Sequence, residues 1–257
     1  MSVAIAVVAK APRAGRSKTR LLPVVSPEQA AGLSIAFLRD IMENLRLAGV
    51  GGAITPYIAY APADAGPVFT RMFPNIALLP ADGAGDAPFG VEGFGRCLLH
   101  AVQAMLARGH HAACVLNADS PTLPTATLRR AAALLSAPGR RAVMGPAEDG
   151  GYYLLGMQQA HVTLFSRIDW STERVAAQTR GRAREAGLEL VELETWYDVD
   201  EPESLHRLAR ELASESDCGI YAAPYTASCL AQLDLGPAPN DTHHAACAHD
   251  AAAGVLP

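Results

Sequence analysis

The sequence predicts an α/β fold in which a mostly parallel sheet is covered by helices on both faces. Short apolar runs, which suit strands buried on both faces, alternate with longer segments of helical periodicity. The valine-rich run Val3–Ala9 is the clearest of these strands. Half of the 257 residues are hydrophobic, which is enough for a sizeable core. Strands that alternate with helices form parallel sheets through right-handed crossovers.

The helix that follows the first strand and its loop begins at a capping box. Ser26 stands at the N-cap, Pro27 at the first helical position and Gln29 three residues after the cap. Apolar side chains recur at helical spacing up to Gly49, which can end the helix. Pro56 favours a sheet edge for the second strand, because proline donates no ladder hydrogen bond. Further strands are expected at 53–60, 76–79, 112–117, 142–145, 152–157 and 188–193, and further helices at 93–108, 125–136, 171–186 and 201–213.

The composition changes from Ser214 onward to alanine, proline and small polar residues without a sustained period. We therefore expect one domain over residues 1–213 and a weakly ordered tail over 214–257. The tail contains several potential zinc ligands, but their spacing matches no known pattern, so no zinc site is expected. These residues are Cys218, Cys229, Cys247, His243, His244 and His249.

The overall charge and the cysteine content limit the classes of partner. The net charge of −5 and the pI of about 5.9 argue against nucleic acid as the main partner. Five scattered cysteines without a CxxC pair indicate a reducing compartment. The apolar start lacks the basic residues of a signal peptide, and no run approaches the roughly 20 residues of a membrane span. We expect a cytoplasmic protein without a membrane partner.

The loop after the first strand, AKAPRAGRSKTRL over residues 9–21, is rich in cations, and no acid occurs before Glu28. Ligands of such sheets bind beyond the carboxyl ends of the strands. The loop lacks the glycines of a Walker loop or a dinucleotide fingerprint, so we expect side chains to hold the phosphates of a nucleotide. A solvated basic loop is the alternative. The candidate phosphate-binding residues are Lys10, Arg13, Gly15, Arg16, Lys18 and Arg20.

Three aspartates are candidate metal ligands. Asp119 follows a buried strand, where a carboxylate can hold Mg²⁺ or Mn²⁺ against a diphosphate, although it can equally start a turn. Asp198 and Asp200 follow the last strand and point to one side of an extended segment. At least one of them could complete a metal site with Asp119. The alternative for Asp200 is a helix N-cap.

The segment Glu148-Asp149-Gly150-Gly151-Tyr152 places two acids before two glycines, between two apolar runs. Such a segment suits the wall of a ligand site, where glycines permit close approach. Asp-Gly is also a plain hairpin signal, and this interpretation stays open.

Five motifs together resemble one family. AKAPRAGRSKTRL, DSPTLP, GPAEDGGYYLLG, DWSTERVAAQT and DVDEPESL occur in the order seen in the selenodomain-associated transferases, also called arsenosugar-biosynthesis glycosyltransferases. That family belongs to the nucleotide-diphospho-sugar transferase superfamily, whose fold is GT-A, and is similar to the 2-phospholactate guanylyltransferases. The resemblance covers roughly residues 3–212 and implies a GT-A-like, Rossmann-like fold.

The resemblance also implies roles for individual residues. Lys18 and Arg20 would contact phosphates during catalysis, Asp119 would bind the metal, and Asp198 and Asp200 the metal or substrate. Asp149 would act in catalysis. Candidate residues that face the sugar or acceptor are Asp149, Gly150, Gly151, Tyr152, Trp170, Ser171 and Thr172, although an N-cap serine behind a packed tryptophan explains the last three equally well.

The sequence departs from the family before the third helix. Family members have a compact Gly-Asp-Leu-Gly-x-Arg run, whereas here APFGVEGF separates Gly85-Asp86 from Gly95-Arg96. Asp86 and Arg96 stay candidate nucleotide-binding residues, beside an enlarged loop.

We therefore expect a divalent-metal-dependent transferase with a nucleotide-linked donor. Glycosyl transfer from a nucleotide sugar to a small-molecule acceptor is the first hypothesis. Nucleotidyl transfer with release of pyrophosphate is the alternative, because Lys18 and Arg20 would neutralise that leaving group. A non-catalytic nucleotide-binding regulator is a second alternative.

Overall fold

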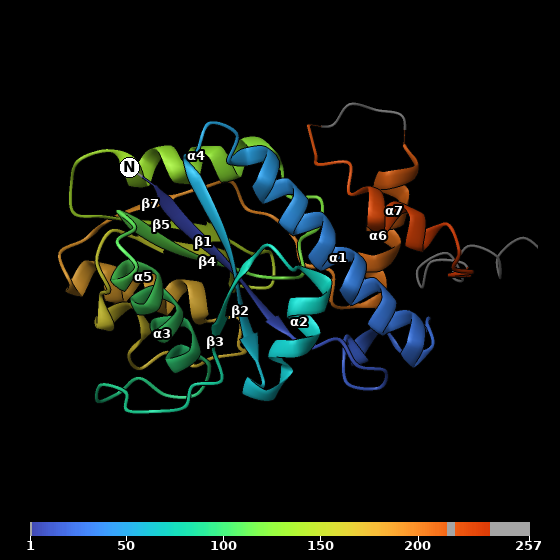
Figure 1. Cartoon of the computed structure of the whole chain (residues 1–257), viewed down its shortest axis with the longest axis horizontal. Coiled ribbons are helices and arrows are strands. Elements are labelled where there is room, and N and C mark those ends of the chain that lie inside the picture. Colours follow the sequence, from blue (N-terminus) through green and yellow to red (C-terminus); the bar gives the residue numbers. More distant parts are fainter. Residues whose placement is uncertain (1, 215–218, 237–257) are drawn as a thin grey trace, which may run out of the picture.

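The computed structural model describes residues 2–214 and 219–236, which form a seven-stranded sheet with helices on both faces (Figure 1). The strand order is β3-β2-β1-β4-β6-β5-β7. β6 is antiparallel to β4 and β5, and the other pairs are parallel, so the predicted mostly parallel α/β fold is confirmed. The strands are β1 Val3–Lys10, β2 Ile54–Ala61, β3 Ala77–Pro80, β4 Ala112–Leu116, β5 Arg141–Pro146, β6 Tyr152–Met157 and β7 Glu189–Glu192.

Local sequence features account for the limits of several helices. At the start of α1 (Pro27–Ala48), Gln29 N donates to Ser26 Oγ at 3.2 Å and Ser26 N to Gln29 Oε1 at 2.7 Å, so the predicted capping box is present.

The α-helices are α1 Pro27–Ala48, α2 Gly66–Met72, α3 Phe94–Ala107, α4 Thr125–Ser136, α5 Val175–Glu185, α6 Pro202–Ala213 and α7 Pro224–Leu230. Short 3-10 helices are η1 Thr19–Leu21, η2 Ala63–Ala65 and η3 Val162–Phe165. In the described ranges, no helix has the length and apolarity of a membrane span.

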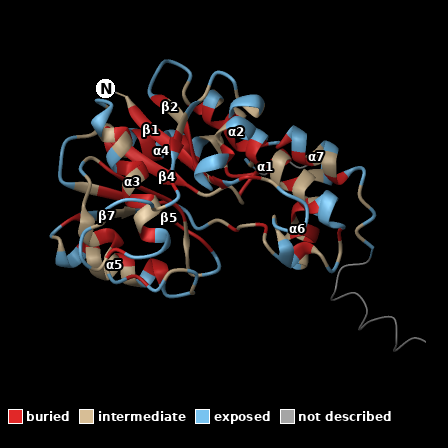
Figure 2. Cartoon of the chain, turned by 60° about the horizontal axis from the view of Figure 1, so that its bottom comes forward, coloured by how far each residue is buried: buried red, intermediate tan, exposed pale blue. Residues whose placement is uncertain are grey.

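Side chains of β1 alternate between two cores, one on each face of the sheet. Val3, Ile5 and Val7 are buried with residues of α1, α2 and α4, whereas Ala4 and Ala6 are buried with residues of α3 and α5. Figure 2 shows this buried centre around β1 and β4. The small alanines on the second face allow α3 to pack closely. The central strand therefore has no solvent-facing side, as its continuous apolar run predicts.

Two expected details differ from the structure. β2 is internal rather than an edge strand, because its pairing with β3 begins at Tyr57, one residue after Pro56, where no ladder bond is required. α5 begins at Val175 rather than at Ser171, because Ser171 has a φ of 62° and cannot continue a right-handed helix.

A third core joins the start of α1 to α6 and to part of the expected tail. Residues 224–230 form α7, which lies beside α1 and α6 (Figure 1) and buries Leu230 with Phe37 and Leu205. Backbone N–H groups of Tyr225 and Thr226 donate to the buried carboxylate of Asp40 at 3.1 and 2.6 Å. The expectation of a weakly ordered tail therefore does not hold for 219–236. Of its potential zinc ligands, all but Cys229 lie outside the described residues.

We expect Asp40→Ala to release α7 from α1. The Asp40 carboxyl is buried, which raises its pKa. Without it, the N–H groups of Tyr225 and Thr226 would lose their hydrogen-bond acceptor. The free energy of unfolding should fall by about 1–3 kcal/mol, and the amides of 224–230 should exchange faster with deuterium. Asp64→Ala, at an exposed carboxylate of η2, is the matched control. Unchanged exchange of α7 in Asp40→Ala would contradict this assignment.

Candidate active site

Hydrogen bonds between two loops bring the predicted aspartates together. Asp119 follows β4, and Ser120 Oγ donates to the carbonyl oxygen of Tyr197 at 3.0 Å. The backbone N–H of Val199 donates to the carbonyl oxygen of Asp119 at 2.9 Å. These contacts place the segment 197–200, with both its aspartates, beside the carboxyl end of β4. The N-cap of α6 is Glu201 rather than Asp200, so the Asp200 side chain is available to the site.

Lys18 is a buried counter-ion at the centre of this cluster. Its Nζ donates to Asp119 Oδ1 at 2.6 Å, to Asp200 Oδ1 at 3.2 Å and to the Val199 carbonyl at 2.8 Å. Its side chain is only 5% exposed, and its ammonium lies 4.8 Å from the centre of the Phe37 ring. Burial lowers the pKa of Lys18, but the two carboxylates more than offset this and raise it. Lys18 is thus oriented towards carboxylates and does not extend from the loop.

The aspartates carry more negative charge than Lys18 balances. Burial, followed by the charges of Asp149 and Asp200, raises the pKa of Asp198 to about 6, and Asp119 adds to this effect. In the described part of the chain, no three acidic, histidine or cysteine side chains are already gathered as a metal-binding group. The carboxylate oxygens nevertheless have the chemistry that Mg²⁺ and Mn²⁺ prefer. The local charge therefore favours a cation.

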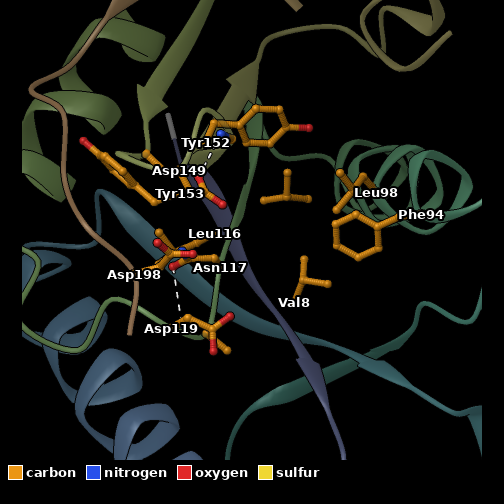
Figure 3. A pocket seen from close by; sticks show the side chains of 14 residues that line it. Val8, Phe94, Leu98, Leu116, Asn117, Asp119, Asp149, Tyr152, Tyr153 and Asp198 are labelled. Carbon is orange, nitrogen blue, oxygen red and sulfur yellow. Dashed lines mark hydrogen bonds between the residues drawn. The ribbon is translucent and has the colours of Figure 1, made fainter. Parts of the chain in front are cut away.

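A pocket of about 190 Å³ opens beside these carboxylates at the carboxyl ends of β1 and β4 (Figure 3). One side is apolar and the other is polar, as suits a ligand with a flat apolar part and a charged part. The apolar side includes Val8, Phe94 and Leu98, and the polar side includes Asn117, Asp119, Asp149 and Asp198. Neither Asn117 nor the apolar residues are among the site residues predicted from the sequence. Asn117 follows the same strand as Asp119, so the strand-end rule could have found it.

The turn between β5 and β6 forms the wall that holds Asp149. The backbone N–H of Gly151 donates to Asp149 Oδ1 at 2.8 Å, which fixes the carboxylate at the rim of the pocket. Gly150 has a φ of 86°, and its carbonyl oxygen accepts from Ala176 N at 2.9 Å, at the start of α5. Hairpin turn and pocket wall are thus the same structure.

Gly150→Ala is expected to distort this wall. A Cβ at position 150 would lie 2.2 Å from the carbonyl oxygen of Glu173, and the positive φ disfavours any L side chain. The free energy of unfolding should fall by at least about 1–2 kcal/mol, measured by urea denaturation. Gly32→Ala is the matched control, because a Cβ at position 32 would meet no other atom within 4 Å and helix propensity favours alanine. A variant at position 150 as stable as the wild type would contradict the close packing described here.

None of the cations of the first loop, Lys18 included, lines this pocket. Arg13 and Arg16 are exposed, as are Gly15 between them and Lys10 at the end of β1. Arg20 is also exposed, and its guanidinium lies 3.7 Å from Glu201 Oε1. These side chains form a basic surface outside the described pocket, whereas Lys18 alone among them is buried in the cluster.

Asp86 and Arg96 do not line the pocket. The Arg96 guanidinium donates to the carbonyl oxygen of Gly85, so it fastens the base of the enlarged loop. The carbonyl of Asp86 lies 3.1 Å from the His100 ring nitrogen. Val91 anchors the loop in the core beneath α3, while Phe89 at its tip is fully exposed.

Trp170 packs behind the pocket rather than in it. Its ring lies edge-on to Phe94 at 5.8 Å and to Tyr152 at 6.4 Å, and both of these residues line the pocket. Thr172 donates its hydroxyl to the carbonyl of Asp169 at 2.7 Å, and Ser171 is exposed in the same turn. The motif therefore supports the wall through Trp170.

Comparisons with known proteins agree with this fold. The family model described as "Uncharacterized protein conserved in bacteria (DUF2064)" matches residues 47–172. No curated protein matches the chain. A protein from Desulfovibrio desulfuricans G20, provisionally named a nucleotide-diphospho-sugar transferase, is 28% identical with a TM-score of 0.75, covering 90% of this chain and 95% of that one. The fold is that of this superfamily.

Two further structures share the fold at lower identity. A CMP:2-keto-3-deoxy-manno-octonic acid synthetase complexed with CTP is 12% identical with a TM-score of 0.53, covering 84% of this chain and all of that one. A cytidylyltransferase from Leptospira borgpetersenii serovar Hardjo-bovis (strain JB197) is 12% identical with a TM-score of 0.51. The match covers 92% of this chain and 100% of that one. These two structures show the shared fold alone, whereas the likeness to the Desulfovibrio protein supports a transferase with a nucleotide-linked donor.

Proposed function

We propose that the protein transfers a glycosyl group from a nucleotide sugar to a small-molecule acceptor, with a divalent metal as cofactor. The observation that carries the proposal is the convergence of Asp119, Asp149, Asp198 and Asp200 at the carboxyl end of β4, beside a pocket with one apolar side. The likeness to the Desulfovibrio protein supports the donor class. The motifs shared with the arsenosugar-biosynthesis glycosyltransferases support glycosyl transfer as the reaction.

The carboxylates fit a hard divalent cation. Asp119, Asp198 and Asp200 would hold Mg²⁺ or Mn²⁺. Burial and, after it, repulsion from the neighbouring carboxylates raise the pKa of Asp198, and a cation at this place would relieve that repulsion. When bound, such an ion neutralises the donor diphosphate and stabilises the departing nucleoside diphosphate. Lys18 orients Asp119 and Asp200 through their Oδ1 atoms, which leaves each carboxylate a second oxygen.

The remaining groups bind the nucleotide base, attract the donor or accept a proton from the acceptor. Phe94 and Leu98 offer an apolar surface to the flat base of the nucleotide. Arg13 and Arg16 attract the anionic donor towards the site through their exposed charges. Asp149, whose Oδ1 is held by Gly151 N, is the carboxylate that would accept the proton of the acceptor hydroxyl.

Nucleotidyl transfer is the second candidate, and the exposed arginines of the first loop favour it. A leaving pyrophosphate carries more charge than a nucleoside diphosphate bound to a metal, and arginine binds phosphate bidentately. Arg20→Ala separates the two reactions. If the reaction is nucleotidyl transfer, kcat and kcat/KM should fall together by about a hundredfold, whereas for glycosyl transfer KM should rise and kcat should change little.

The decisive experiment follows products by phosphorus NMR. The full chain is incubated with nucleoside triphosphates or nucleotide sugars, with and without Mg²⁺ or Mn²⁺. Release of a nucleoside diphosphate from a nucleotide sugar, only with metal and acceptor, is the expected result. Pyrophosphate released from a triphosphate would establish the second candidate instead. Nucleotide binding without any turnover would support the remaining hypothesis, a non-catalytic nucleotide-binding regulator.

A further inference from the structure

A second cavity, of about 430 Å³, lies beside the first and shares the side chains of Asp149 and Asp198 with it. Its other walls come from η1, the segment 197–201 and the first turns of α6. We propose that this cavity binds the acceptor, and that the acceptor is a hydroxyl-rich molecule without a phosphate or carboxylate group. The inference rests on the proposed function, since it assigns the nucleotide-linked donor to the first pocket.

The proposed class of acceptor is inferred from the charges of the residues that line the second cavity. Carboxylates outnumber guanidinium groups two to one. A divalent cation held by Asp119, Asp198 and Asp200 would lower this excess of negative charge without removing it. An anionic acceptor would meet like charge on most sides, which is costly at a partly enclosed site. The carboxylates are Glu148, Asp149, Asp198, Asp200, Glu201 and Glu203, and the guanidinium groups belong to Arg20, Arg207 and Arg210.

Two of the three guanidinium groups of this cavity lie beside carboxylates of the protein itself. Arg207 Nη1 lies 2.9 Å from Glu148 Oε2, its Nε donates to Glu211 Oε1 at 2.9 Å, and its guanidinium lies 3.8 Å from the centre of the Tyr197 ring. Arg20 lies 3.7 Å from Glu201. A phosphate would have to displace Glu148 and Glu211 before it could bind Arg207. Binding of a phosphorylated acceptor is therefore disfavoured both by repulsion from the carboxylates and by competition with the ion pairs.

Carboxylate oxygens are well suited to hydroxyl groups, because each accepts hydrogen bonds and needs no donor of its own. Asp149 and Asp198 stand on the boundary between the two cavities. An acceptor hydroxyl bound to Asp149 from the second cavity would face a donor in the first. The size of the second cavity is enough for a small polyol or sugar.

Matched pairs of an uncharged sugar or polyol and its phosphate test the proposal by saturation-transfer NMR on the full chain with Mg²⁺. The pairs are glucose and glucose 6-phosphate, ribose and ribose 5-phosphate, and glycerol and glycerol 3-phosphate. We expect the uncharged member to bind at least about tenfold more tightly in each pair that binds. Glu203→Lys, at an exposed residue of the lining, should reduce this ratio several-fold. Asp64→Lys, an equal charge change on η2 outside the lining, should leave it unchanged.

Preference for the phosphorylated members, a ratio that Glu203→Lys does not alter, or no binding of any pair would overturn the proposal. The proposed function is tested separately in the same samples by phosphorus NMR with UDP-glucose and GDP-mannose as donors. Donor cleavage with a preference for sugar phosphates would refute the acceptor class alone. A preference for uncharged sugars without donor cleavage by any acceptor would refute the glycosyl transfer.

Discussion

Asp119→Asn is expected to lower kcat/KM of the metal-dependent reaction by at least about a hundredfold. The amide keeps the shape of the side chain and removes the charge that both Lys18 and the proposed metal require. The fold should be kept, and the free energy of unfolding should fall by about 1–3 kcal/mol, because the buried ammonium of Lys18 loses one charged partner but keeps its contact with Asp200. Steady-state kinetics measure the loss of kcat/KM, and titration of Mn²⁺ followed by electron paramagnetic resonance measures the loss of metal binding.

Asp86→Asn is the matched control for this variant. Asp86 is an exposed aspartate on the enlarged loop and does not line the pocket. Its replacement should leave both kcat/KM and Mn²⁺ affinity unchanged. Full activity of Asp119→Asn with unaltered Mn²⁺ binding would remove Asp119 from the metal site.

Lys18→Ala is expected to reduce both activity and stability. The substitution removes a buried ammonium that joins the carboxylates of Asp119 and Asp200, so the two side chains would repel each other and lose their orientation. We expect kcat to fall by about a hundredfold and the free energy of unfolding by about 1–3 kcal/mol. Because these effects come from positioning, they should appear for either proposed reaction.

Lys18→Met separates charge from packing. Methionine keeps most of the length of the apolar stem and removes the ammonium, with its charge and its hydrogen bonds, from its place near the Phe37 ring. If the ammonium is the important part, Lys18→Met should lose as much activity as Lys18→Ala and lose less stability. Wild-type kcat in Lys18→Met would show that the ion pairs do not position the site.

Local sequence features were sufficient to predict most individual elements. α4 spans the expected residues Thr125–Ser136, and α1 begins at its predicted capping box, since caps and periodicity act within a few residues of the chain. The apolar run of β1 predicted a strand buried on both faces. The strand-end rule also selected Asp119, and the pair of acids before two glycines selected Asp149; both residues line the pocket.

Tertiary structure alone decided what these residues contact. Lys18 looks like a phosphate-binding residue in the sequence, yet it pairs with Asp119, 101 residues away, because burial leaves its ammonium no solvent to interact with. Likewise α7 is invisible to periodicity, since a short helix forms only where Asp40, 185 residues earlier, accepts its first N–H groups. Sequence thus determined which elements form and where charge lies along the chain. Packing of distant segments determined which charges are paired and which remain for a ligand.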